Sequence, residues 1–312
     1  MKVLFHYDAG TKLREELAGL AEQGIEVVCC PEGQSEPFET ELADAEAIWH
    51  VLQPITAEVI ARAPKLRLIQ KIGVGVNTID LDAARARNIA VCNMPGTNSR
   101  AVAEMTLLLM LAALRKLPRI DRVCRSGQWA PDRETRETFG EVGGRTIGFV
   151  GYGGVPTILA PILEAMGANI VYTATSKKNV EYPFLSLDEV LATADIVSLH
   201  LPLSEATEKM IDSQRLASMK PGSILVNTAR GGLVDEQALL CALQDGNLSA
   251  AGLDVFYSEP VSEDNPLLAL DNVAVAPHVA WLTEETFSRS TDIALHNTLA
   301  IRNGSALLHQ VT

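Results

Sequence analysis

Short apolar runs alternate with segments of helical periodicity along the first hundred residues. The pattern predicts strands at Lys2–Tyr7, Glu26–Cys30, Ala47–Val51, Leu66–Lys71 and Ala90–Cys92, with a helix at Thr11–Gln23 and further helical segments between the later strands. Strands that alternate with helices at this spacing predict parallel pairing, and therefore an α/β fold.

A second alternation follows a charged, irregular stretch at 118–144. It predicts strands at Thr146–Val150, Ile170–Thr173, Ile196–Leu199, Ile224–Asn227, Ala251–Val255 and Val273–Ala276. This succession is typical of a doubly wound nucleotide-binding sheet. The apolar segment Ala101–Leu114 contains Glu104 and is too short to cross a bilayer, so we predict a buried helix there.

Composition narrows the class of protein. With 312 residues, 47% hydrophobic and 21% charged, the chain is expected to be globular and to form two domains. Its formal net charge of −13 disfavours nucleic acid and membranes as partners. The five cysteines form no CxxC pair and the N-terminus lacks a secretory signal, which indicates reduced thiols, no metal site and a cytoplasmic location.

A glycine-rich turn directly follows the strand Thr146–Val150. Gly151, Gly153 and Gly154 would let the N–H groups of Gly154 and Val155 approach a pyrophosphate at a helix N-terminus. Pro156 stands where the fingerprint G-x-G-x-x-G has its third glycine, but proline is tolerated in the first turn of a helix. Pro161 is expected to loosen or kink that helix. A simple strand-to-helix turn is the alternative interpretation.

The residues after the next strand bear on the choice of dinucleotide. NAD enzymes usually carry an acidic residue there for the adenosine ribose, but this chain has Ser176, Lys177 and Lys178. Two lysines and a hydroxyl favour the 2′-phosphate of NADP over NAD. A solvated loop with two surface lysines remains the alternative.

Three chemically suitable side chains follow later strands. Arg230 could bind a carboxylate and polarise a ketone, His278 could exchange a proton near neutral pH, and Glu259 could orient the imidazole and favour its charged form. Each alone is more often a surface or structural residue. Because the carboxyl ends of parallel strands share one edge of a sheet, we expect the three to converge.

With these segments in view, the chain resembles the D-isomer-specific 2-hydroxyacid dehydrogenases, in particular glyoxylate and hydroxypyruvate reductases. The segments that carry the likeness are IGVGVNTIDLDAARARNIAVCNMPGTNSRAVAE, VGYGG, HLPLSEAT, NTARGGLVDE, AAGLDVFYSEP and APHVAW. The resemblance implies two Rossmann-like domains. Residues 1–99 and 284–312 would form a discontinuous substrate-binding domain, and residues 100–283 the dinucleotide-binding domain.

The resemblance also implies which residues meet each ligand. Arg230, Glu259 and His278 would be catalytic, and backbone N–H groups of Val74 and Gly75 would bind the substrate carboxylate, with Trp281 nearby. The implied cofactor-binding residues outside the glycine loop are Thr106, Ser176, Lys177, His200, Pro202, Thr207, Thr228, Ala229, Arg230, Asp254 and Ala280. Asp254 would accept from the carboxamide. A homodimer formed through the cofactor domains is also implied.

Other classes of function stay open. This fold also serves NAD(P)-sensing corepressors, although no peptide-docking surface or long disordered tail is evident in the sequence. Phosphite dehydrogenases share the Arg, Glu and His set, whereas formate dehydrogenases usually have Gln at the position of Glu259. Gly154 and Pro156 depart from the family pattern, so an inactive homologue with weak cofactor binding is a further alternative; retention of all three catalytic residues argues against it.

Overall fold

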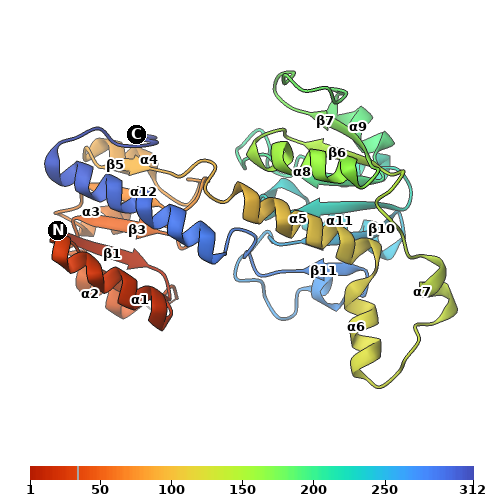
Figure 1. The fold of residues 1–312 in the computed structure, drawn as a ribbon, viewed down its shortest axis with the longest axis horizontal. Helices are drawn as coiled ribbons and strands as arrows, with labels where there is room; N and C mark the ends of the chain where they lie inside the picture. The colour runs from red at the N-terminus through yellow and green to blue at the C-terminus, as the bar shows by residue number, and fades with distance from the viewer. Residues whose placement is uncertain (34) are drawn as a thin grey trace. The chain divides into compact units, whose positions relative to one another are not determined.

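The computed structural model describes residues 1–33 and 35–312, which form two compact units (Figure 1). The first unit contains Met1–Asn98 and Thr283–Thr312, and the second contains Ser99–Leu282. That the first unit binds the substrate and the second the dinucleotide remains a prediction.

The first unit is built on a parallel five-stranded sheet in the order β2-β1-β3-β4-β5. Its strands are β1 (Lys2–His6), β2 (Glu26–Cys30), β3 (Ala47–His50), β4 (Leu68–Lys71) and β5 (Ala90–Cys92). Its helices are α1 (Thr11–Ala18), the 3-10 helix η1 (Gly19–Gln23), α2 (Ser35–Leu42), α3 (Ala57–Arg62), α4 (Leu81–Ala86) and the C-terminal α12 (Glu284–Asn303).

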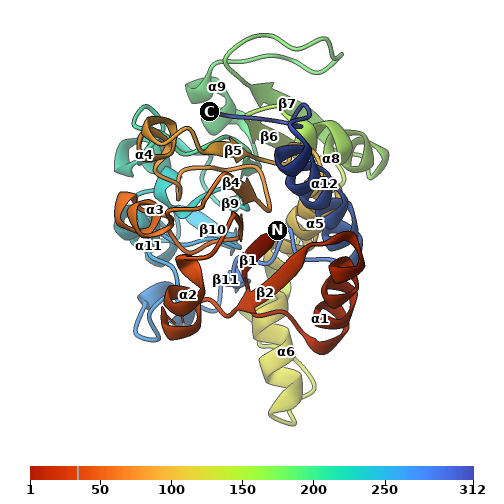
Figure 2. The ribbon, with the colours of Figure 1, turned by 90° about the vertical axis from the view of Figure 1, so that its left-hand side faces the viewer.

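Helices cover both faces of this sheet. Figure 2 shows α3 and α4 on one side, and α1 and α12 on the other. Side chains from α2, α3 and α4, such as Phe38 and Ile60, pack on Leu4, Ile48 and Ile69 of the strands. Strands buried on both sides explain why the apolar runs of the sequence are continuous rather than alternating.

The second unit has a parallel six-stranded sheet in the order β11-β10-β9-β8-β6-β7. Its strands are β6 (Thr146–Val150), β7 (Asn169–Thr173), β8 (Ile196–Leu199), β9 (Ser223–Asn227), β10 (Leu248–Leu253) and β11 (Val273–Val275). Its helices are α5 (Ser99–Leu114), α6 (Leu117–Arg125), α7 (Arg133–Glu137), α8 (Gly154–Ala165), α9 (Leu187–Thr193), α10 (Ser213–Ser218) and α11 (Glu236–Gln244), with 3-10 helices η2 (Gly231–Leu233) and η3 (Pro266–Ala269). A parallel bridge between Tyr172 and Phe184 extends the sheet beyond β7.

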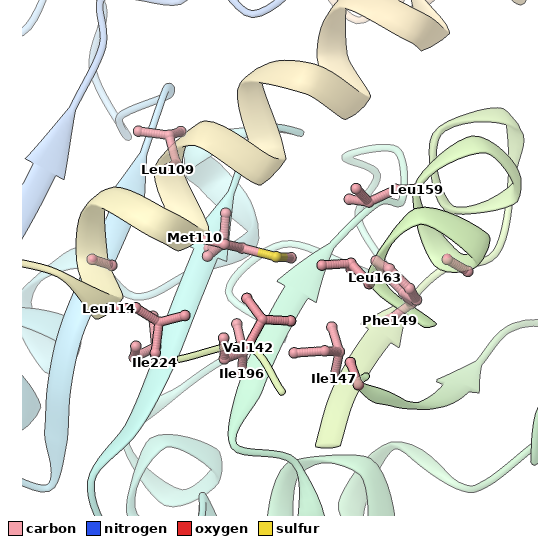
Figure 3. Close-up of a cluster of buried hydrophobic side chains, with 14 of the residues drawn as sticks. Leu109, Met110, Leu114, Val142, Ile147, Phe149, Leu159, Leu163, Ile196 and Ile224 are labelled. Carbon is pink, nitrogen blue, oxygen red and sulfur yellow. The ribbon is translucent and has the colours of Figure 1, made fainter. Parts of the chain in front are cut away.

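Two apolar layers hold this sheet. In Figure 3, Met110 of α5 and Leu163 of α8 lie over Phe149 and Ile196 of the strands. On the opposite face, α9, α10 and α11 bury Val190, Leu216 and Leu239 against strand residues such as Val197 and Leu225. The doubly wound α/β class predicted for both halves is therefore confirmed.

The predicted strands are all present. Their ends differ by at most two residues, apart from Ala251–Val255, which begins earlier as Leu248–Leu253 and leaves Asp254 just beyond the strand. The buried helix predicted at Ala101–Leu114 is α5, and nine of its residues are buried.

Two local expectations need correction. The stretch at 118–144 is not wholly irregular, because it contains α6 and α7; Asp132 caps α7 by accepting from the N–H of Thr135. The helix predicted at Thr11–Gln23 divides at Gly19 into α1 and η1. Pro161 lies inside α8, which extends to Ala165, and the kink expected there stays a prediction.

No helix among residues 1–33 and 35–312 is both long and apolar enough to cross a membrane.

Candidate active site

A tight turn after the central strand β9 presents Arg230. The buried side chain of Asn227 folds this turn, because its Nδ2 donates to the carbonyl of Arg230 (2.8 Å) and its Oδ1 accepts from the N–H of Ala229 (3.0 Å). Nη1 of Arg230 donates to the carbonyl of Ala229 (2.6 Å). Burial lowers the pKa of Arg230 and the charge of Glu259 opposes this, but a guanidinium remains charged in proteins.

Gly231 allows this turn to touch the loop that carries Glu259. A Cβ atom at Gly231 would lie 2.0 Å from the carbonyl carbon and oxygen of Phe256, a distance that no side chain could occupy. Phe256 in turn donates its N–H to Oε1 of Glu259 (2.9 Å). The two loops are therefore in direct backbone contact within the second unit.

Glu259 and His278 form a hydrogen-bonded pair. Nδ1 of His278 lies 2.6 Å from Oε2 of Glu259, and the two side chains are 16% (His278) and 31% (Glu259) exposed. Burial alone would raise the pKa of Glu259, but the bond and charge of His278, the N–H of Phe256 and the charge of Arg230 lower it overall. An ionised carboxylate on Nδ1 fixes the ring and leaves Nε2 to exchange a proton.

Asp254 holds the backbone around His278. Its Oδ1 accepts from the N–H of Val279 and its Oδ2 from the N–H of Ala280, both at 2.9 Å, while its carbonyl accepts from the N–H of His278 (2.7 Å). His278 has φ = 56°, a left-handed conformation that costs a non-glycine residue about 1–2 kcal/mol. The three bonds from Asp254 offset this strain.

Trp281 closes the same loop. Its indole N–H donates to the carbonyl of His278 (3.1 Å), and the residue is 9% exposed. The ring is therefore fixed beside the candidate proton donor. Whether it contacts the substrate, as the resemblance implies, stays a prediction.

The glycine loop fits a dinucleotide. Gly151 has φ = 91°, and a Cβ there would lie 2.3 Å from the carbonyl oxygen of His200, so only glycine is accommodated. Gly153 is the N-cap of α8 and is exposed together with Gly154. Pro156 lies in the first turn of the helix, as expected, and it is buried. The exposed N-terminus of α8 at the carboxyl edge of the sheet suits a pyrophosphate.

The residues predicted to meet the adenosine end are exposed. Ser176 and Lys177 follow β7 in a loop whose acidic residue, Glu181, comes four residues after Lys177, and the N–H of Lys178 donates to the hydroxyl of Tyr172 (2.8 Å). That bond fixes where the loop turns away from the sheet.

His200 and Thr207 are engaged within their own segment. Nε2 of His200 lies 2.8 Å from Oγ of Ser198, and burial lowers the pKa of His200 to about 3, so the ring is neutral. The hydroxyl of Thr207 donates to the carbonyl of Pro202 (2.8 Å) and accepts from the N–H of Ser204 (2.8 Å). These contacts shape the segment, and none of them tests the cofactor contacts expected there.

The loop predicted to bind the substrate carboxylate follows β4 in the first unit. Asn93 donates through Nδ2 to the carbonyl of Val74 (2.9 Å), and the N–H of Met94 donates to the carbonyl of Gly73 (2.8 Å). Val74 is 44% exposed. The carbonyls of Gly73 and Val74 thus anchor the loop, and the side chain of Val74 is exposed to solvent.

The structure brings together residues that the sequence only suggested, and it adds two that the sequence reasoning missed. Arg230, Glu259 and His278 gather on contacting loops of the second unit, with Asp254 behind His278. Asn227 and Gly231 were not predicted, although both lie inside the motif NTARGG. Asn227 could have been identified from the sequence, because it is a polar residue that ends a buried strand just before a functional loop.

Comparison with known proteins identifies the family. Residues 107–280 match the family described as D-isomer specific 2-hydroxyacid dehydrogenase, NAD binding domain. The chain is 39% identical over 268 residues to the glyoxylate reductase of Korarchaeum cryptofilum, covering 84% of this chain and 81% of that one. It is 42% identical over 255 residues to the D-3-phosphoglycerate dehydrogenase of Mycobacterium tuberculosis, covering 79% of this chain but only 47% of that protein, so it spans about half of that relative.

Solved structures agree over the whole length. A protein of Thermus thermophilus matches with a TM-score of 0.91 and 36% identity, with both chains covered completely. The NAD-dependent formate dehydrogenase of Staphylococcus aureus, in complex with NAD, has a TM-score of 0.91 and 26% identity, covering 100% and 99% of the two chains. An acyclic imino acid reductase in complex with NADPH and D-Arg has a TM-score of 0.86 and 27% identity, with full coverage of both. The chain therefore belongs to the D-isomer-specific 2-hydroxyacid dehydrogenases, which transfer a hydride between NAD and a 2-keto or 2-hydroxy acid.

Proposed function

We propose that Arg230, Glu259 and His278 carry out the reduction of a small 2-keto acid to its D-2-hydroxy acid. The observation that carries this assignment is the 2.6 Å bond between His278 and Glu259 on a loop in contact with the Arg230 turn. A cation, a proton donor and an orienting carboxylate are the groups that this reaction needs.

The roles follow from the chemistry of each group. Arg230 binds the substrate carboxylate and the ketone oxygen through its planar guanidinium, which polarises the carbonyl. A dinucleotide bound at the N-terminus of α8 would supply the hydride that the carbonyl carbon accepts. His278 gives its Nε2 proton to the ketone oxygen as the C–O double bond becomes a single bond, and Glu259 stabilises the imidazolium before transfer. In the reverse direction the neutral ring accepts that proton.

The substrate is proposed to be small and anionic. Backbone N–H groups of Val74 and Gly75 would bind its carboxylate, and the relatives named glyoxylate reductase point to glyoxylate or hydroxypyruvate. The test is the loss of reduced-nicotinamide absorbance with glyoxylate, hydroxypyruvate, pyruvate and a longer 2-keto acid. Turnover of at least one of them is expected; inertness towards all four would refute the proposed substrate class.

NADP is proposed as the preferred dinucleotide. The exposed Lys177 and the partly buried Lys178 follow β7 with no acidic residue between them and the strand, which suits a 2′-phosphate, and one structural neighbour was solved with NADPH. Replacing both lysines by Ala should weaken NADPH binding about tenfold or more while leaving NADH nearly unchanged, because bonds to a charged group each contribute about 1.5–3 kcal/mol. An equal effect on both dinucleotides would show that the lysines do not read the phosphate.

A cytoplasmic homodimer is also proposed. Leu108 of α5, Leu117 of α6 and Trp129 are 52%, 45% and 92% exposed, and contact with a second copy of the chain would bury these apolar side chains. The five cysteines are free, as expected for a reducing compartment. Light scattering on a sizing column should give twice the chain mass, and Trp129→Ala or Leu117→Glu should shift the protein towards monomer. A wild-type monomer at micromolar concentration would refute the dimer.

A further inference from the structure

Two buried threonine hydroxyls lie in contact between helix α5 and the end of strand β9. Oγ1 of Thr106 is 2.9 Å from Oγ1 of Thr228 and 2.7 Å from the carbonyl oxygen of Val102, one helical turn earlier. Thr106 is 0% exposed, whereas Thr228 retains 8%. The pair thus connects the core of the second unit to the edge where its catalytic loops gather.

The donor and the acceptor of each of these two hydrogen bonds can be assigned from the protein alone. A carbonyl oxygen can only accept, and two oxygens 2.7 Å apart with no proton between them would repel each other, so Thr106 must donate to Val102. Each hydroxyl has a single proton. The contact at 2.9 Å therefore requires that Thr228 donates to Thr106. The oxygen of Thr228 then has only lone pairs left to offer.

The carboxylate of Asp254, next to Thr228, is also only a hydrogen-bond acceptor. The N–H of Asp254 donates to the carbonyl of Asn227 (3.0 Å), so Asp254 and Thr228 sit at the ends of adjacent strands. An ionised carboxylate only accepts hydrogen bonds. Two acceptor groups side by side at this edge should select a ligand group that carries donors.

We propose that Thr106 is a positioning residue that makes Thr228 an obligate acceptor and thereby selects the amide of the nicotinamide ring. The inference rests on the proposed function and on the expectation that Asp254, which lies beside Thr228 at the ends of adjacent strands, accepts from the carboxamide of the nicotinamide ring. The carboxamide carries two N–H donors. A ring with a carboxylate or an acetyl group in its place has none, and would leave the oxygen of Thr228 facing another acceptor or a methyl group.

The test compares three dinucleotides that differ only at this group: NAD, nicotinic acid adenine dinucleotide and 3-acetylpyridine adenine dinucleotide. Their dissociation constants are measured by calorimetry, so the readout does not depend on turnover. The wild-type protein should bind NAD tightest and the carboxylate analogue weakest. Thr106→Val frees the proton of Thr228 to donate, so the preference for NAD over the carboxylate analogue should fall about tenfold, as expected for a bond of about 1.4 kcal/mol.

Two variants serve as matched comparisons. Thr106→Ser keeps the hydroxyl and should retain the wild-type preference. Thr298→Val removes another buried helical threonine, which likewise donates to the carbonyl one turn earlier, Ala294 (2.7 Å), but lies in the first unit, so it controls for lost stability alone. If Thr106→Val fails to fold, Thr228→Val removes the acceptor itself and should bring the NAD and acetylpyridine affinities together.

Opposite outcomes overturn the inference. An unchanged preference in Thr106→Val or Thr228→Val, with NAD still bound, would show that Thr228 does not read the amide. The same loss of preference in Thr298→Val would mean that general stability is responsible. If the wild-type protein binds neither these three dinucleotides nor NADP, the proposed function fails and the inference with it; if it binds NADP alone, the same comparison is made with the 2′-phosphorylated forms of the three dinucleotides.

Discussion

Asp254→Asn should slow turnover strongly while leaving the fold almost as stable as before. The two carboxylate oxygens of Asp254 accept from the N–H groups of Val279 and Ala280, each at 2.9 Å, and so hold the loop that bears His278. An Asn side chain has one carbonyl oxygen and one NH2 group. It can therefore satisfy only one of the two N–H groups, and its NH2 faces the other.

The magnitude follows from these contacts. A hydrogen bond to a charged group contributes about 1.5–3 kcal/mol, and the loop loses one such bond while His278 keeps its unfavourable φ of 56°. Displacing a catalytic group by about 1 Å can cost about 100-fold in rate. We therefore expect turnover to fall by about 10- to 100-fold, with a smaller change in KM for the keto acid.

Stability should respond differently. Asp254 is 1% exposed, and burial raises its pKa even though the N–H groups of Ala280 and Val279 oppose the shift. A raised pKa means that ionisation of this carboxyl at neutral pH costs folding free energy, a cost that disappears as the pH falls through the folded-state pKa. Asn cannot ionise and avoids that cost, which offsets the lost bond.

The assay pairs steady-state kinetics with thermal unfolding of the same samples. Turnover reduced by at least tenfold with Tm shifted by only a few degrees supports a role in positioning His278. Wild-type turnover in Asp254→Asn would refute the reasoning. A collapse of Tm that parallels the loss of activity would do the same, because it would make Asp254 a general stabiliser of the fold.

The remaining predictions test the surrounding loops. Arg230→Lys should raise KM for the keto acid and lower kcat, together by at least about tenfold, because an ammonium cannot make the paired bonds of a guanidinium; unchanged kcat/KM would place the carboxylate elsewhere. Gly231→Ala should destabilise by about 1–3 kcal/mol in urea unfolding and reduce activity, since its Cβ would overlap the backbone of Phe256; wild-type behaviour would contradict the close contact. His200 has a pKa lowered to about 3, so between about pH 6.5 and 3 only the unfolded chain binds its proton, and stability should fall by up to about 1.4 kcal/mol per pH unit of acidification. His200→Gln should flatten that slope, and an identical slope in the variant would show that this ring is not buried as neutral imidazole.

The architecture could be predicted from sequence because parallel strands buried on both faces leave a strong signal. The runs KVLFH, TIGFV and SILVN are apolar on both faces, and each is followed by glycine, polar or helical residues. Segment α6 escaped prediction because four of its nine residues are charged and none is buried, although Leu117, Ile120 and Val123 recur with a helical spacing.

The candidate site could be predicted only as a set of residue types. The positions of Arg230, Glu259 and His278 after strands implied that they share one edge of the sheet. The sequence could not show which groups hydrogen-bond to a carboxylate such as that of Asp254. Asp254 was expected to meet the carboxamide, and the structure shows both its oxygens bonded to backbone N–H groups. These bonds depend on the loop after β11 folding back over the end of β10, which no local pattern encodes.

The proton transfer assigned to His278 is the central claim, and His278→Ala tests it most directly. The experiment measures turnover of the best 2-keto acid and, on the same protein, the dissociation constant of the reduced dinucleotide. General acid catalysis typically contributes about 10²–10⁴-fold, so turnover should fall by that factor while the dinucleotide binds as tightly as before. Turnover within a few-fold of the wild type would contradict the account, because the proton would then have to come from another group.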